Sequence, residues 1–595
     1  MRLMTRWGRA LDPDDILSEY PRPNLRRDSC LILNGEWDCG ISKEKDQSNY
    51  EGKILVPFSP ETLLSGVNKT VGPEDYLHYR RVFRLPEGFQ KDRLLLHFGA
   101  VDQECEVFLN DRPVGCHKGG YLPFSFDITE YLVPGDNTLC LCVTDKTELA
   151  PHARGKQKLV REGKYHWLFY PPQSGIWKTV WLESVTCDYI KEVKITPLFD
   201  ERAVRILVLA NREQPPERRV QIRIWSHRGG LLEENAAPGE EVTIPLGALY
   251  PWTPEHPNLY DVKIQMGADQ VSSYFGMRKF SVRYDRKGVR RFFLNNEPFF
   301  FNGLLDQGYW PESLMTPPCD EALLYDIVAL KELGYNTIRK HVKVEPERFY
   351  YHCDRLGMIV WQDMPNGGGE YDLHFVTDLP NESDEFARSV GDGPENYAIL
   401  GRSDARGREQ YYKDLRDMIA LLYNHPCIAA WVPFNAGWGQ FDAAKATDLV
   451  RQLDPTRLIN EACGWFDQSG GDMHSIHSYG GGLEVKPSPE RVVALTEYGG
   501  YAYPVEGHTA CENLFGYQVY RSSEELMDNY LQLWEEKIYP NLKAGLSAAI
   551  YTQTSDIEEE ITGIMTYDRE IIKLPALDVL ALNEKLYRLF DELTE

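Results

Sequence analysis

Short stretches in which apolar and polar residues alternate occupy the first part of the chain. Between about residues 30 and 185 they are separated by turn residues, as in RLLLHFGAV, PFSFDI and NTLCLCVTD. Alternation with a period of two, broken by frequent turns, indicates antiparallel β-strands. Within FLNDRPVG, Asn and Asp tolerate the positive φ of a tight turn, which predicts a hairpin. We therefore predict an all-β domain over residues 1–185.

A second group of alternating stretches follows over residues 186–283. It includes EVKITPLF, RILVLAN, RVQIRIWS and YDVKIQM, and no helix-length amphipathic pattern interrupts it. Its length suits an immunoglobulin-like β-sandwich.

After residue 283 short apolar runs alternate with helical segments. Eight such runs can be distinguished: FFFNGLL, NTIRKHV, MIVWQDM, CIAAWVPFN, RLINEA, MHSIHSY, VVALTEYGG and LSAAIYTQT. Eight strand–helix repeats indicate a (β/α)8 barrel, here over residues 284–595. One helix is predicted in DEALLYDIVALKELG, with Leu323, Ile327 and Leu330 on one face and Gly334 at its C-cap. The link between the fifth and sixth runs is short, and we expect no full helix there.

Composition narrows the class of protein. At 595 residues the chain has room for three or four domains. It has no apolar run of membrane-spanning length, and MRLMTRWGRALDPDD lacks the apolar segment of a signal peptide, so we expect a cytoplasmic protein. A net charge of −25 argues against nucleic acid and membrane surfaces as partners. The 12 cysteines form no paired CxxC motifs, so neither disulfides nor structural zinc are expected.

In a (β/α)8 barrel the active site lies at the C-terminal ends of the strands. The polar residues at which the eight runs end are rich in carboxylates and hydroxyls, and no glycine-rich phosphate-binding motif is present. Carbohydrate chemistry suits such a site. The residues are Asp306, Gln307, Arg339, His341, Asp363, Asn435, Ala436, Glu461, His477, Tyr479, Glu497, Gln553 and Asp556.

Glu497 is the strongest catalytic candidate among them. It emerges from the apolar run VVAL and is followed, after Tyr498, by two glycines, a context that is unusual for a solvated surface glutamate. Retaining glycosidases need two carboxyl groups about 5 to 5.5 Å apart, one as nucleophile and one as general acid/base. A partner carboxyl group is therefore expected at the end of another strand.

Nearly the whole chain resembles glycoside hydrolase family 2. The resemblance is carried by LNGEWDCG, YRRVFRLP, GGYLPFSFDIT and GIWKTVWLE in the first domain, and by GYNTIRKH, DRLGMIVWQDMPN, WVPFNAGWGQFD and LTEYGGYAYPVEGH in the barrel. It implies a jelly-roll sugar-binding domain, an immunoglobulin-like domain and a catalytic (β/α)8 barrel, which agrees with the division at 1–185, 186–283 and 284–595. It also implies a retaining exo-β-glycosidase that requires no cofactor.

The resemblance assigns the nucleophile to Glu497 and the general acid/base to position 436, directly after Asn435. This chain has Ala436 there, although the residues around it keep the pattern. A natural pseudoenzyme is expected to lose more than one catalytic group, whereas an engineered Glu→Ala change removes only one. We favour the engineered change. Glu461 and Glu312 are other nearby glutamates, but neither matches the family position.

Further site residues follow from the resemblance and from strand position. Asn435 is expected to bind the sugar hydroxyl next to the anomeric carbon, Arg339 to keep Glu497 ionised, and Tyr479 to donate a hydrogen bond to it. His341, Asp363 and His477 are expected to bind substrate. Among the tryptophans that could stack on a sugar ring, Trp438 is assigned to the substrate, with Trp310 and Trp465 as further candidates; Trp361 lies within a strand and is expected to pack in the core.

Metal binding is not predicted. The histidines of MHSIHSY lie three residues apart, which places them on opposite faces of a strand. The acidic SDIEEE is interpreted as a solvated loop rather than a cation site.

The sugar is less narrowly defined. The resemblance associates glucuronidases with an Asn-x-Lys motif after the eighth strand, but here Ile571 stands two residues before Lys573, which disfavours a glucuronidase. β-Galactosidase is the first choice, and galactofuranosidase and arabinopyranosidase stay open. A carbohydrate-binding protein without activity is the alternative from another class. We expect segment 366–400 to close over the site, and a homo-oligomer stays open.

Overall fold

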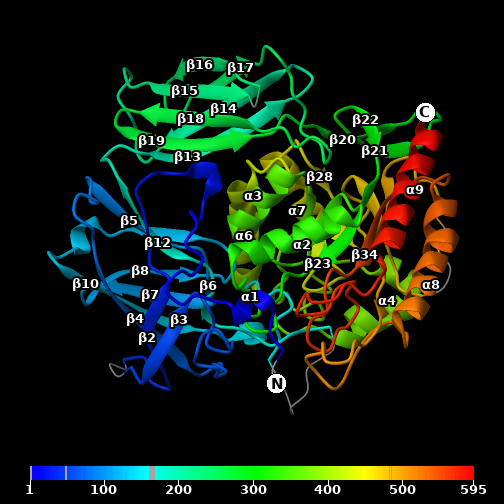
Figure 1. Ribbon diagram of the computed structural model, residues 1–595, viewed down its shortest axis with the longest axis horizontal. Coiled ribbons are helices and arrows are strands. Elements are labelled where there is room, and N and C mark those ends of the chain that lie inside the picture. Colours follow the sequence, from blue (N-terminus) through cyan, green and yellow to red (C-terminus); the bar gives the residue numbers. More distant parts are fainter. Residues whose placement is uncertain (1–2, 47–49, 160–167, 227, 481–482, 484) are drawn as a thin grey trace.

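The structure is a computed structural model that describes residues 3–46, 50–159, 168–226, 228–480, 483 and 485–595. Figure 1 shows the first β domain in blue and cyan, the second above it in teal and green, and the barrel beside both.

The first domain consists of two antiparallel sheets packed face to face. Their facing apolar side chains form one core, so the all-β prediction is confirmed. Asn110 and Asp111 have φ values of 52° and 60° at the turn between β7 and β8, as expected for the predicted hairpin. One sheet has the order β1 (Cys30–Ile32), β12 (Val180–Val185), β5 (Arg93–Phe98) and β9 (Phe124–Asp127), and the other β3 (Gly52–Val56), β2 (Gly35–Ser42), β4 (Tyr76–Arg84), β10 (Asp136–Thr144), β7 (Glu104–Leu109) and β8 (Arg112–Lys118).

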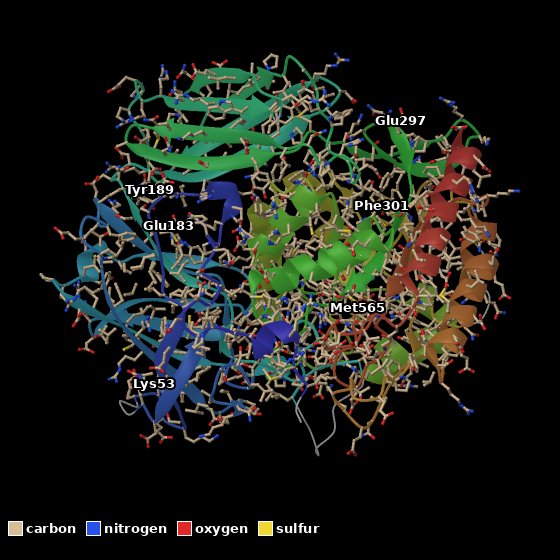
Figure 2. The ribbon with its side chains drawn as sticks, viewed as in Figure 1. Lys53, Glu183, Tyr189, Glu297, Phe301 and Met565 are labelled. Carbon is tan, nitrogen blue, oxygen red and sulfur yellow. The ribbon has the colours of Figure 1, made fainter. Side chains whose placement is uncertain are left out.

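The second domain is a smaller antiparallel sandwich with its own core. A buried ion-pair cluster joins it to the first domain: Arg27 contacts Glu183 of β12 at 3.2 Å and Asp269 of β19 at 3.1 Å. Figure 2 shows Glu183 and the neighbouring Tyr189 at this junction. The sheets are β13 (Ile190–Leu198), β14 (Ala203–Ala210) and β17 (Glu241–Pro245), and β16 (Leu231–Ala236), β15 (Val220–Ser226), β18 (Tyr260–Met266) and β19 (Asp269–Phe275).

Eight parallel strands form a nearly closed barrel, and each of the eight predicted runs contains one of them. The two end strands of this sheet, β28 and β30, come from the fifth and sixth runs, and no helix lies between them. The short link seen in the sequence therefore marks the open seam. In sheet order the strands are β28 (Leu458–Ile459), β26 (Ile428–Val432), β25 (Ile359–Asp363), β24 (Thr337–Lys340), β23 (Phe301–Asp306), β34 (Leu546–Thr552), β31 (Val492–Gly499) and β30 (Met473–Ser478).

Helices cover the outside of the barrel. The predicted helix is α2 (Asp320–Glu332); its residues Leu323, Ile327 and Leu330 are buried, and Gly334 follows it with a φ of 89°, as a helix-ending glycine should. The other long helices are α3 (Glu347–Leu356), α6 (Ala405–Leu422), α7 (Ala443–Leu453), α8 (Ser523–Leu533) and α9 (Ala576–Thr594). None of the helices in the described part of the chain is long and apolar enough to cross a membrane.

Two segments cross the predicted divisions. Strand β20 (Phe280–Tyr284) pairs with β21 (Arg290–Leu294), so one hairpin spans the proposed boundary at residue 283. The N-terminal segment with α1 (Arg6–Arg9) lies on the barrel, where the backbone N–H of Thr5 donates to Glu312 at 3.1 Å. The residues near the N-terminus therefore pack on a different domain from the strands that follow them.

Candidate active site

Glu497 lies at the C-terminal end of β31 and is 9% exposed. Its Oε1 accepts a hydrogen bond of 2.7 Å from the Tyr479 hydroxyl, and its Oε2 lies 3.2 Å from Nη1 of Arg339. His477 pairs with Glu497 across β30 and β31, and its Nε2 lies 3.9 Å from Oε2. Both carboxylate oxygens are thus oriented by neighbouring groups.

A fully buried guanidinium joins four strand ends of the site. Arg339 donates from Nε and Nη2 to the two oxygens of Asp363 at 3.1 and 2.9 Å, and from Nη2 to Oδ1 of Asn435 at 2.6 Å. His341 completes this set, with its Nδ1 3.0 Å from Asp363. Bidentate pairing fixes the plane of the guanidinium, so Arg339 holds Asn435 and Glu497 in a defined relation.

The charges of this network favour an ionised Glu497. Burial raises the pKa of its carboxyl, but His477 and Arg339 lower it, and the net pKa lies below the usual 4.5. Burial also lowers the pKa of His477 to about 4, so this imidazole is neutral at pH 7. Arg339 is therefore the permanent positive charge beside Glu497. Burial, and then the Glu497 charge, raise the pKa of Tyr479 well above 10, which keeps its hydroxyl a donor.

Ala436 follows Asn435 at the end of β27 (Phe434–Asn435) and is 5% exposed. Its φ is 48°, and its N–H donates to the Cys463 carbonyl at 2.8 Å. The backbone of this turn is held by hydrogen bonds on both sides, since the Asn435 side chain binds Arg339. Position 436 thus adjoins a residue that shares one guanidinium with Glu497.

Aromatic side chains surround these polar groups. Tyr479 stacks on Tyr517 with ring centroids 3.9 Å apart. Trp465 lies edge-on to His477, with ring centroids 5.0 Å apart. Trp438 lies 6.2 Å from the His341 ring. Trp438 and Trp465 belong to an apolar cluster with Ala436 and with buried residues of segment 366–400, such as Tyr371 and Leu400. That segment therefore packs against the loop that carries position 436.

Other sequence candidates lie outside this network. Trp310 packs between Trp7, at 6.1 Å, and the Arg569 guanidinium, at 4.1 Å. Trp361 packs against Phe301 in the barrel core, as expected. Glu461 accepts a hydrogen bond of 2.8 Å from the backbone of Gly470.

Glu312, the second alternative glutamate, also lies outside the network around Glu497, since it is bound to the N-terminal segment through Thr5. Different partners bind the side chains of Glu461, Glu312, His474 and His477, so these four residues do not gather at one place. His474 pairs with Asp467 and not with the site, which agrees with the opposite-face prediction. Among the described residues no group of three His, Cys, Asp or Glu side chains is arranged to hold a metal ion.

The interpretation of SDIEEE as a solvated loop is wrong. Asp556 and Glu560 are each 2% exposed. Asp556 forms an ion pair with Lys573 at 2.6 Å, and Glu560 accepts a hydrogen bond of 2.5 Å from the Tyr170 hydroxyl. These buried partners stabilise the charges that solvent was expected to stabilise.

Several residues next to the site could not be recognised from strand ends. Tyr517 lies in the long loop after β31, and Lys156 and Tyr170 come from a loop of the first domain. Nothing in the local sequence distinguishes them. Tyr517 lies in a loop of the barrel, and the proximity of Lys156 and Tyr170 arises from the docking of two domains.

The fold and this arrangement define a three-domain protein with a (β/α)8 barrel whose strand ends carry one oriented, ionised carboxylate in an aromatic setting. Residues 33–182 match "Glycosyl hydrolases family 2, sugar binding domain", residues 189–278 match "Glycosyl hydrolases family 2", and residues 287–469 match "Glycosyl hydrolases family 2, TIM barrel domain". The chain belongs to glycoside hydrolase family 2, as its motifs predicted.

Relatives with different names resemble the chain. A β-galactosidase of Thermoanaerobacter pseudethanolicus is 26% identical over 489 residues, which are 78% of this chain and 59% of that protein. A β-glucuronidase of Paenibacillus borealis is 24% identical over 74% of each chain. This chain spans 41% and 36% of the length of two putative β-glucuronidases of Formosa agariphila.

Solved structures share the fold over nearly its whole length. The Bifidobacterium dentium β-glucuronidase complexed with coumarin-3-O-glucuronide has a TM-score of 0.73 at 20% identity, covering 95% of this chain and 98% of that one. A β-galacturonidase from Eisenbergiella tayi has a TM-score of 0.67 at 18% identity, covering 96% and 98%. The predicted jelly-roll, immunoglobulin-like and barrel architecture is thereby confirmed.

Proposed function

We propose that the chain is a retaining exo-β-glycosidase for a terminal neutral sugar, β-galactoside first, that lacks its general acid/base at position 436. The observation that carries the proposal is Glu497, a buried carboxylate kept ionised by Arg339 and oriented by Tyr479. An ionised, oriented carboxylate is what attack on an anomeric carbon requires. In the intact site a glutamate at 436 would protonate the leaving oxygen and then activate water.

The surroundings of Ala436 support a single replacement. Asn435, Arg339, Tyr479 and Glu497 form one connected set of hydrogen bonds. A site released from selection for catalysis has no reason to keep this set complete. We therefore propose an engineered Glu→Ala change over a natural pseudoenzyme.

The bonding of Lys573 supports a neutral sugar. This lysine is 1% exposed, and its Nζ donates to Asp556 at 2.6 Å and to the Ile561 carbonyl at 3.0 Å. A lysine that is buried and already paired with a carboxylate does not offer its charge to the carboxylate of a uronic acid. The relatives named β-galactosidase are consistent with this choice.

Azide rescue tests the proposal on the protein as it stands. With a dinitrophenyl β-galactoside, whose leaving group needs no acid, Glu497 is expected to become glycosylated and then to wait for a base. Azide attacks without a base, so turnover should rise at least about tenfold and yield a β-glycosyl azide. Product is identified by mass spectrometry and NMR, with sodium chloride at equal ionic strength as the control. Absence of glycosyl azide with every neutral aryl glycoside tested would refute the assignment.

The pH dependence of this reaction is expected to be one-sided. Glu497 is active when ionised, and its pKa lies below the usual 4.5. We therefore expect kcat/KM to be at its maximum above the pKa of Glu497 and to fall as the pH drops through that pKa. The facing groups do not titrate in the working range: Arg339 stays charged, Tyr479 stays protonated, and His341 and His477 stay neutral because burial lowers their pKa values. A plateau between about pH 5 and 9 is expected. A decrease on the alkaline side would show that some other group supplies the missing proton.

A further inference from the structure

A loop of the first domain reaches the barrel next to the proposed active site. Its backbone N–H groups at Arg154 and Gly155 donate to the Asn366 carbonyl at 2.9 and 3.0 Å. The Arg154 guanidinium also donates to the carbonyls of Gly368 and Gly369 at 2.5 and 3.0 Å. These contacts fix the loop on the segment that follows β25, so the residues after Arg154 are placed with respect to the barrel.

Lys156 is the next charged residue of this loop and is only 5% exposed. Its Nζ lies 5.3 Å from the ring centroid of Trp438, 5.4 Å from that of Tyr170 and 3.7 Å from Oε2 of Glu560. Among the described residues, none places an acceptor within hydrogen-bonding distance of this nitrogen. Since its ion pair with Glu560 in the described part of the chain is long, this buried ammonium group retains donors for a ligand.

Glu560 is held more firmly than Lys156. The Tyr170 hydroxyl donates to its Oε2 at 2.5 Å, and the Thr562 hydroxyl to its Oε1 at 3.3 Å. Gln307 in turn donates to Tyr170 at 2.6 Å and to Oε1 of Gln553 at 2.7 Å.

This row of polar groups is incomplete. In the part of the chain that the structure describes, the buried Oε1 of Gln307 has no hydrogen-bond partner. Gln307 and Gln553 lie where the first and eighth barrel strands end, and each is at most 2% exposed. Buried amide atoms are normally satisfied, so the open position of Gln307 indicates that a polar ligand completes this wall, which is formed by Lys156, Tyr170, Gln307, Gln553 and Glu560.

Side-chain contacts connect this wall to the nucleophile. The Trp438 ring centroid lies 6.2 Å from that of His341, whose Nδ1 is 3.0 Å from Asp363. Asp363 in turn binds the Arg339 guanidinium, which lies beside Glu497. Trp438, over which Lys156 sits, is two residues from position 436. Groups at these places can contact the sugar whose anomeric carbon Glu497 attacks.

We propose that Lys156 is a specificity-determining residue that acts with Glu560: its ammonium donates to one hydroxyl oxygen of the bound sugar, while Glu560 accepts from a neighbouring hydroxyl. The inference rests on the proposed function, since it assigns the part of the substrate that this wall recognises. A donor and an acceptor side by side suit two neighbouring hydroxyl groups of a neutral sugar. The carboxylate of a uronic acid would be repelled by Glu560. The first domain thus contributes directly to substrate choice.

The test combines protein variants with substrates that lack single hydroxyls. With Ala436→Glu restored, Lys156→Met is compared with its parent on an aryl β-galactoside and on its monodeoxy analogues. Hydrogen bonds to charged groups contribute about 1.5–3 kcal/mol, so kcat/KM should fall about 10- to 100-fold on the parent sugar. For one monodeoxy analogue the variant and its parent should be nearly equal, because the partner hydroxyl is already missing. Lys156→Arg, which keeps the charge, should retain part of the activity.

Lys178→Met is the matched control. Lys178 is also 5% exposed and lies in the same domain, but its Nζ donates to the Tyr121 carbonyl at 2.8 Å. It tests whether loss of any buried lysine at the domain contact has the same effect. An equal loss on all the analogues, or no loss, would overturn the inference, and so would a loss confined to aryl β-uronides, because Lys156 would then bind a carboxylate.

Binding measurements separate the two proposals. Calorimetric titration of the unchanged Ala436 protein with methyl β-glycosides and their deoxy analogues should show the same dependence on Lys156 without any catalysis. If Ala436→Glu is inactive but binding depends on Lys156, the proposed function fails and the inference holds. If the restored protein is active and Lys156→Met binds and cleaves like its parent, the inference alone fails. Unfolding temperatures of all variants show whether each one is folded.

Discussion

Ala436→Glu is expected to raise kcat/KM for an alkyl β-galactoside by about 10²- to 10⁴-fold, the usual contribution of a positioned general acid/base. An alkyl leaving group needs a proton, so the gain should be largest there and small for a dinitrophenyl glycoside. The restored enzyme should also gain an alkaline limb in its pH profile, which the Ala436 protein lacks. Hydrolysis of a series of glycosides with graded leaving groups measures all three effects.

The backbone at position 436 permits this change. Its φ of 48° is already adopted by an L-residue with a Cβ atom, so glutamate brings no backbone strain that alanine lacks. The Asn435 side chain and the Ala436 N–H are bound to Arg339 and Cys463, which hold the turn irrespective of the new side chain. Apolar neighbours such as Trp438 should raise the pKa of the new carboxyl, as an acid catalyst requires.

Ala436→Gln is the matched control for the restored glutamate. It has the same shape but cannot transfer a proton, so it should remain as slow as the Ala436 protein on alkyl glycosides. If both variants stay inactive on a broad panel of aryl glycosides, the chain is better described as a carbohydrate-binding protein with alanine by descent. If both become active, the gain arises from packing and not from acid catalysis.

The architecture could be predicted because its signals are local. Each barrel strand is a short apolar run bounded by polar residues, and all eight were found. Even the open seam between β28 and β30 was visible as a link too short for a helix. The contact of the N-terminal segment with the barrel could not be predicted, since Thr5 and its partner Glu312 are 307 positions apart in the sequence.

The site could be predicted only as far as strand ends define it. Arg339, Asp363, Asn435 and Glu497 lie in one hydrogen-bonded set because parallel strands bring their C-terminal ends together. The same rule also suggested Glu461, which turns away to bind the Gly470 backbone. Side-chain direction at a strand end depends on bulges and loop paths that no sequence period encodes.

The groups that were missed come from loops and from another domain. Lys156 and Tyr170 approach the barrel only after the two domains dock, and the buried Glu560 is bound by the Tyr170 hydroxyl. The acidic run that contains Glu560 therefore resembled a solvated loop when its sequence was considered alone. Burial by a partner distant in sequence is the physical property that local patterns lack.

Glu497→Gln in the Ala436→Glu background is expected to reduce kcat by roughly 10⁶-fold, the size of the loss when the nucleophile of another covalent mechanism is removed. An amide has the shape of the carboxylate but cannot form the glycosyl ester. The fold should persist, because Arg339 keeps its bidentate pairing with Asp363. Steady-state kinetics gives the loss, and the unfolding temperature shows whether the protein is intact.

A covalent label identifies the attacked atom directly. A glycosyl donor with a good leaving group and fluorine beside the anomeric carbon should leave a stable adduct on the peptide that contains Glu497, and none in Glu497→Gln. Glu461→Gln is the matched control: Glu461 is a strand-end glutamate, 1% exposed, but bound to Gly470, so this variant should label and turn over like its parent. Label on any other carboxylate would place the nucleophile elsewhere. The assignment of position 436 as its partner would then lose its structural support, because that support is the contact of Arg339 with Glu497 and with Asn435, the residue before position 436.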